Sequence, residues 1–72
     1  MVIREKIVVI EKYISDDEWL TDRQIRDRAD ECGWGTYPNM SMVRCQLQLL
    51  IRDYEVVWRW RKGEKVKEYR RR

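Results

Sequence analysis

Residues 56–70 read VVWRWRKGEKVKEYR, and this stretch decides the fold. Its first part, 56–61, is rich in β-branched and aromatic side chains and alternates with a period of two residues, which is typical of a β-strand. Residues 66–70 form a second, shorter segment of the same character. The intervening residues 62–65, KGEK, have the composition of a turn. The sequence therefore predicts a C-terminal β-hairpin.

The register of this hairpin depends on where its turn lies. If the two-residue loop is Gly63-Glu64, Gly63 takes the positive φ of a type II′ turn. The resulting cross-strand pairs are Trp58 with Tyr69, Arg59 with Glu68, and Arg61 with Val66. An aromatic pair and an opposite-charge pair are both favourable, whereas a loop at Lys62-Gly63 gives poorer partners. In this register Trp58 is expected to pack in the core, and the position of Trp60, nearer the tip, stays open.

Residues 2 to about 15 form the first of three amphipathic segments upstream of the hairpin. Their isoleucines recur at spacings of four, three and four, which matches one face of an α-helix. These positions are Ile3, Ile7, Ile10 and Ile14. Residues 7–10 also fit a buried strand, but the length of the periodic stretch favours a helix.

A capping box marks the start of a second helix. The Thr21 hydroxyl can accept from the backbone N–H of Gln24, and the Gln24 side chain can return a bond to the N–H of Thr21. The helix is therefore predicted to begin at Asp22, and Gly33 is its expected C-terminal stop. Its inward stripe consists of Ile25, Ala29 and Cys32.

The third helix, at about residues 41–53, is the longest and cleanest amphipathic segment of the chain. Either Asn39 or Ser41 can cap its N-terminus. Its predicted inward positions are Met40, Val43, Leu47, Leu50, Ile51 and Tyr54. After it, the final arginines, 70–72, are expected to fray.

The charges of the chain are distributed unevenly. The net charge is +3, but residues 1–35 carry six basic and nine acidic side chains, whereas residues 36–72 carry ten basic and four acidic ones. A basic rear half suggests a polyanionic partner. At 72 residues the chain forms one domain with a modest core, so its stability is marginal, and dimerisation is a more plausible support than a disulfide.

Several function classes find no support in the sequence. There is no nucleophile paired with a base, no phosphate-cradling glycine loop and no metal-ligand set, so we expect a protein that is not an enzyme and needs no cofactor or metal. The two cysteines, Cys32 and Cys45, are expected to be reduced. No membrane span or export signal is visible, which predicts a soluble cytoplasmic protein, or one in the host cytoplasm if it is viral.

Four stretches carry a resemblance to a known family. Residues 19–25, WLTDRQI, look like a short first strand leading into a capped helix. Residues 41–50, SMVRCQLQLL, look like a recognition helix. Residues 54–57 look like the connection from that helix to the first strand of a wing, and residues 62–64 look like the tip of the wing. Together they resemble the winged-helix branch of the helix-turn-helix proteins, and the small size resembles the compact members from archaeal viruses and plasmids.

The resemblance implies a single domain over residues 1–72 with an α+β, mainly α fold: three helices and a C-terminal two-stranded β-hairpin wing at about 56–70. It also implies double-stranded DNA as the partner and a role as a small transcriptional regulator, acting alone or as a homodimer. Two departures stand against a strict match. The loop between the second and third helices is long, and Glu55 stands where the family usually has glycine.

The resemblance also implies which residues would contact DNA. The third helix would lie in the major groove, where Arg44 could bind guanine and Gln48 adenine. The alternative is that both merely solvate a polar helix face. The predicted nucleic-acid-binding residues are Ser41, Arg44 and Gln48 on the helix, and Arg61, Lys62, Lys65 and Lys67 on the wing. Wing cations suit phosphate contacts, although a charged edge that discourages aggregation is the rival interpretation.

A second hypothesis takes the same scaffold as a protein-interaction module. Fold does not fix function, and exposed aromatic residues could form a protein interface instead. The candidate interface residues are Trp34, Tyr37 and Trp60.

Overall fold

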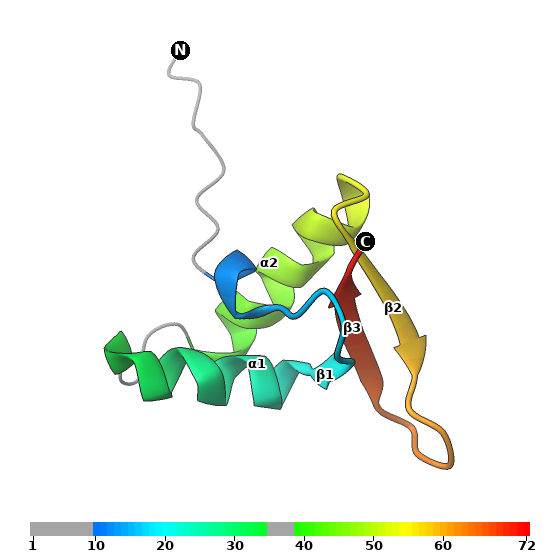
Figure 1. Ribbon diagram of the computed structural model, residues 1–72, viewed down its shortest axis with the longest axis horizontal. Coiled ribbons are helices and arrows are strands. Elements are labelled where there is room, and N and C mark those ends of the chain that lie inside the picture. Colours follow the sequence, from blue (N-terminus) through cyan, green and yellow to red (C-terminus); the bar gives the residue numbers. More distant parts are fainter. Residues whose placement is uncertain (1–9, 35–38) are drawn as a thin grey trace.

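The chain forms three short strands and two α-helices in the computed structural model, which describes residues 10–34 and 39–72 (Figure 1). In chain order the elements are a 3₁₀ helix η1 (Glu11–Tyr13), strand β1 (Leu20–Thr21), helix α1 (Asp22–Ala29), a π-helical turn η2 (Asp30–Trp34), helix α2 (Met40–Arg52), strand β2 (Val56–Trp60) and strand β3 (Lys67–Arg71).

The sheet is antiparallel and has the strand order β1-β3-β2, so the last strand lies in the centre. Strand β3 pairs with β2 in the predicted register, with Trp58 opposite Tyr69 and Arg59 opposite Glu68. On its other edge the same two residues of β3 pair with Leu20 and Thr21. The predicted hairpin is confirmed, and strand β1, which lies much earlier in the chain, pairs with β3 as the third strand of the sheet.

The predicted fold of three helices and a two-stranded wing is therefore wrong. Residues 10–34 and 39–72 hold two α-helices and a three-stranded antiparallel sheet, which is a small α+β fold. The third strand arises because β1 satisfies backbone groups of β3 that a hairpin alone would leave at an open edge.

The hairpin turn differs from the predicted type. The Arg61 carbonyl accepts from the Glu64 N–H at 3.0 Å, so Gly63, with its φ of 78°, is the third residue of the turn and not the second. The Arg61 N–H donates to the Val66 carbonyl at 2.7 Å and closes a loop of residues 62–65. Because this loop has the same centre as the predicted one, the register is unchanged.

The described part of the predicted first helix is not α-helical. Residues 1–9 lie outside the described residues, and Glu11–Tyr13 is a single 3₁₀ turn after which Ile14 is extended. Ile10 and Ile14 are buried as predicted, but Tyr13 is buried beside them. A tight turn followed by extended chain can bury residues three or four apart, so the spacing alone does not require an α-helix.

Helix α1 begins as predicted. The Thr21 hydroxyl accepts from the Gln24 N–H at 3.1 Å, and the Gln24 side chain accepts from the Thr21 N–H at 2.9 Å. The α-helix ends at Ala29, earlier than the predicted stop at Gly33, which lies within η2 and adopts a φ of 94°. Cys32 is exposed, so its assignment to the inward stripe is wrong.

Helix α2 is capped by Asn39, whose side chain accepts from the Met42 N–H at 2.9 Å. This decides the choice between Asn39 and Ser41. Tyr54 does not face inward as predicted, since it is 74% exposed and adopts a φ of 60°. It ends the helix in the left-handed conformation that glycine usually supplies, while the Glu55 N–H reaches back to the Leu50 carbonyl at 2.9 Å.

The core lies where the helices pack against the sheet. The largest side chains that are buried completely are apolar, and burial of each contributes roughly 1.5–3 kcal/mol. They are Ile10, Ile25, Val43, Leu47 and Leu50. Trp58, predicted to be a core residue, is 39% exposed because only the first residue of β2, Val56, reaches this core.

The C-terminal arginines are held in place, which corrects the expectation that they fray. The Arg71 N–H donates to the Ser15 carbonyl at 2.8 Å, and the Arg72 N–H donates to the Glu55 carbonyl at 3.1 Å. These bonds fasten the end of β3 to the segments before β1 and after α2.

The capping box predicts the effect of two substitutions. Thr21→Ala should lower the free energy of unfolding by about 1 kcal/mol more than Thr21→Ser, because serine keeps the hydroxyl that accepts from Gln24. Urea denaturation of the two variants measures this difference. Equal stability of the two would show that the cap bond contributes nothing.

Candidate nucleic-acid interface

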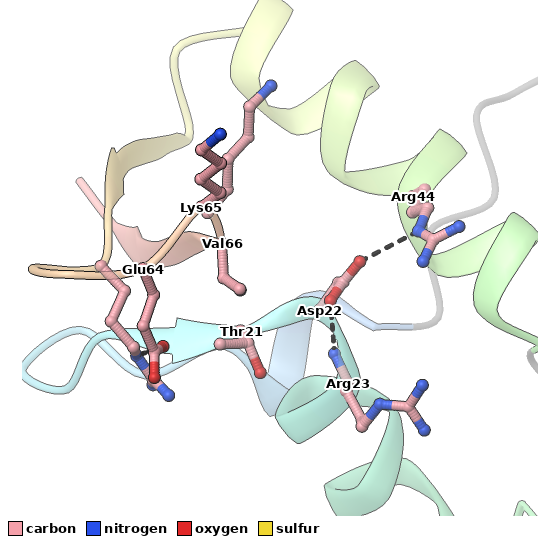
Figure 2. Close-up of a pocket in the computed structure, with 9 residues that line it drawn as sticks. Thr21, Asp22, Arg23, Arg44, Glu64, Lys65 and Val66 are labelled. Atoms are coloured by element: carbon pink, nitrogen blue, oxygen red, sulfur yellow. Dashed lines mark hydrogen bonds and ion pairs between the residues drawn. The ribbon is translucent and has the colours of Figure 1, made fainter.

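A cleft of about 470 Å³ lies between the tip of the hairpin, the start of α1 and the side of α2 (Figure 2). Three elements that are distant in sequence meet there because β1, which leads directly into α1, pairs with β3 of the hairpin. The cleft is lined by Thr21, Asp22, Arg23, Arg44, Arg61, Glu64, Lys65, Val66 and Lys67.

The lining of the cleft is predominantly cationic. Five of its nine residues are Arg or Lys and two are acidic, which gives the lining a net charge of +3. Side chains of one sign around a concavity focus the electrostatic field into it and attract ions of the opposite sign. The cleft is therefore suited to an anionic ligand.

Arg44 projects into the cleft from α2. Its Nε donates to Asp22 Oδ2 at 3.0 Å, and its side chain nevertheless remains 65% exposed (Figure 2). Asp22 also accepts from the backbone N–H of Arg23 at 2.8 Å. The ion pair fixes Arg44 beside the start of α1 and leaves most of its surface accessible to a ligand.

Arg61 has a largely structural environment. Its Nε donates to Glu68 Oε2 and its Nη2 donates to Gln24 Oε1, both at 3.0 Å. Glu64 lies 3.9 Å from the same Nε. Arg61 therefore joins the hairpin to the capping box of α1, and it has less charge to offer a ligand than the sequence suggested.

Glu68 lies on the central strand, buried beneath two arginines. The predicted pair with Arg59 is confirmed, because Arg59 Nε donates to Glu68 Oε1 at 2.8 Å, and Arg61 Nε donates to the other carboxylate oxygen, Oε2, at 3.0 Å. The hydrogen bond from Arg59 holds the pKa of Glu68 below its usual value of 4.5; burial opposes this shift and Arg61 reinforces it. Arg59 also packs against an aromatic side chain, since its guanidinium lies 4.2 Å from the centre of the Trp19 ring.

The remaining predicted binding residues divide into two groups. Lys65 and Lys67 line the cleft with Arg44 and Arg61. Ser41, Gln48 and Lys62 are exposed but do not line it. Within the described residues no hydrogen bond or ion pair engages Lys62 or Lys65, so both ammonium groups are available to a ligand.

The structure brings Arg23 into the cleft, which sequence reasoning missed. Its place in the first turn of α1 gave no signal, because nothing in the sequence shows that β1 draws this turn against the hairpin.

The open question about Trp60 is decided by its exposure. Trp60 is 57% exposed and packs edge-to-face on Trp58, with ring centres 5.5 Å apart. Lys67 Nζ lies 4.5 Å from the Trp58 ring and 5.6 Å from the Trp60 ring. Of the other two candidate interface residues, Tyr37 and the side chain of Trp34 lie outside what the structure describes.

Comparison with known proteins finds no matching family model, no matching curated protein and no matching solved structure. The resemblance to winged-helix proteins therefore stays a prediction.

Among residues 10–34 and 39–72, no group of three or more His, Cys, Asp or Glu could hold a metal ion. In the same residues no helix has the length and apolar character needed to cross a membrane.

The lowered pKa of Glu68 predicts an acid-labile fold. The folded protein binds a proton at Glu68 less readily than the unfolded chain, so this carboxylate stabilises the fold above about pH 4.5, and the stabilisation is lost as the pH falls below that value. The urea midpoint of the wild type should fall more steeply with acidification than that of Glu68→Gln. A control variant, Glu31→Gln, removes an exposed carboxylate and should keep the wild-type steepness. Equal steepness in wild type and Glu68→Gln would refute this role of Glu68.

Proposed function

We propose that the protein binds double-stranded DNA through the cationic cleft and the adjoining face of α2, as a small transcriptional regulator. The observation that carries the proposal is the meeting of Arg44 from α2 with Lys65 and Lys67 from the hairpin in one cleft. Cations that lie far apart in sequence form one surface there. Such a surface is what the phosphate backbone of a duplex requires for register and affinity.

The side chains, and not the start of α1, supply this attraction. The backbone N–H groups of Arg23 and Gln24 are already bonded to Asp22 and Thr21. A phosphate in the cleft would therefore be held by guanidinium and ammonium groups. Lys65 is the best placed of these groups, because no described residue neutralises it.

The exposed face of α2 supports reading of bases. Ser41, Arg44 and Gln48 recur at spacings of three and four, so they share one face of the helix, and all three are exposed. An α-helix fits the major groove of B-form DNA, where Arg can bind guanine and Gln can bind adenine. With phosphates held in the cleft, this face of α2 would lie beside the duplex.

One observation favours a second candidate function, a protein-interaction module. Trp60 is more than half exposed and lies next to exposed Trp58, and such aromatic pairs are common at protein interfaces. This candidate predicts that Trp60→Ala abolishes binding of a protein partner while DNA binding in the cleft is absent.

The DNA proposal predicts a salt-dependent affinity that one lysine changes. The logarithm of the affinity for a short DNA duplex should fall linearly with the logarithm of the salt concentration, and Lys65→Ala should reduce that slope by roughly 1. Fluorescence anisotropy over a series of salt concentrations measures both quantities. The matched control is Lys12→Ala, which removes the same charge from a residue that does not line the cleft. Lys12 lies in η1, and η1 is bonded to Arg71 at the end of β3 that is distant from the hairpin turn.

Two results would contradict the proposal. One is the absence of binding at low salt, or an affinity that does not change with salt. The other is an equal loss in Lys65→Ala and Lys12→Ala, since this would show attraction to the net charge of the chain and not to the cleft.

A further inference from the structure

Strand β2 carries an aromatic platform, Trp58 and Trp60, on the half of the strand that runs beyond the core. The two residues alternate along the strand and so share one face, and their rings meet at an angle of 88°. Val56 on the same face is buried, whereas exposure rises to 39% at Trp58 and 57% at Trp60. Neither ring belongs to the cluster of buried core residues, so aromatic surface of this platform faces solvent.

The platform is continuous with the cationic cleft through Lys67. This residue lines the cleft and pairs directly with Trp60 across the strands. Its ammonium group lies over Trp58 and close to the Trp60 ring. A ligand that places an anionic group near Lys67 would therefore have the Trp60 ring beside it.

The two rings have different roles in this arrangement. The Lys67 ammonium lies nearer to the Trp58 ring, and Trp58 also packs edge-to-face with Trp60. Trp60 is the more exposed of the two, so it offers the free aromatic surface. A π-face beside a cation matches the two halves of a nucleotide, a flat base and a phosphate.

We propose that Trp60 stacks on an unpaired nucleobase of a strand whose phosphates lie in the cationic cleft. Inside a duplex both faces of every base are already stacked on neighbouring bases, so a ring at the hairpin can reach a base face only where the strand is unpaired. The preferred ligand is therefore a duplex that continues into a single strand. This inference rests on the proposed DNA-binding function and specifies the kind of DNA.

The test compares a blunt duplex with the same duplex extended by a short unpaired thymidine tail. The wild type should bind the tailed DNA at least about fivefold more tightly, because stacking of a base on an aromatic side chain contributes a factor of about five or more. Trp60→Ala should bind both DNAs equally, with the affinity of the wild type for the blunt duplex. Trp60→Phe keeps an aromatic ring and should keep most of the preference.

A second variant separates the two proposals. Lys65→Ala should weaken the binding of both DNAs and leave their ratio unchanged. Thermal denaturation should show a Trp60→Ala midpoint close to that of the wild type, because the side chain lies outside the core.

The outcomes are distinct. Equal wild-type affinity for both DNAs, or a preference that survives in Trp60→Ala, would overturn the stacking proposal while leaving duplex binding intact. The first of these results is also the one expected if the platform serves a protein partner. Absence of binding to either DNA would overturn the proposed function itself.

Discussion

The pairing of the buried Glu68 carboxylate with Arg59 and Arg61 is the interaction on which the rest of the structure depends. Glu68 sits on the central strand, opposite Thr21 of β1 and Arg59 of β2, so its position joins all three strands. A buried charge is tolerated only when it is paired and hydrogen-bonded, and Arg59 and Arg61 supply both bonds. The second of these arginines also reaches Gln24 of the capping box, and the start of α1 is thereby fixed against the hairpin.

This arrangement divides the basic residues of the hairpin into two groups. Arg59 lies over Trp19 and is engaged by Glu68, so it belongs to the framework. Arg61 belongs largely to the framework as well. Lys65 and Lys67 lie in the cleft without a carboxylate partner among the described residues. The framework arginines bind Glu68, and Arg61 also joins the hairpin to the start of α1, while the lysines add positive charge to the cleft.

Features that depend on neighbouring residues could be predicted from the sequence. The register of β2 and β3 follows from alternation and one glycine, and the capping box at Thr21 needs only residues three apart. Features that depend on distant pairing could not. The resemblance indicated a short strand within residues 19–25, but nothing in the sequence indicated that this strand, β1, pairs with β3 and brings Arg23 into the cleft.

The same limit explains the other errors of prediction. The exposure of Tyr54 follows from a left-handed φ at the end of α2, where the helical spacing of apolar residues no longer applies. Trp58 was expected in the core, but only the first residue of its strand, Val56, reaches the core, and exposure rises along β2. Charge alone nominated the cations of the hairpin as a group, whereas their division between framework and cleft depends on Glu68.

The most direct test of the account is a nuclear magnetic resonance titration of the labelled protein with duplex DNA at low salt. If the cleft is the binding surface, backbone amide shifts will concentrate at residues 21–23, at Arg44 and at 64–67, and the amides of Glu11–Tyr13 will hardly move. Shifts that spread evenly over the chain, or that avoid the cleft, would contradict the account.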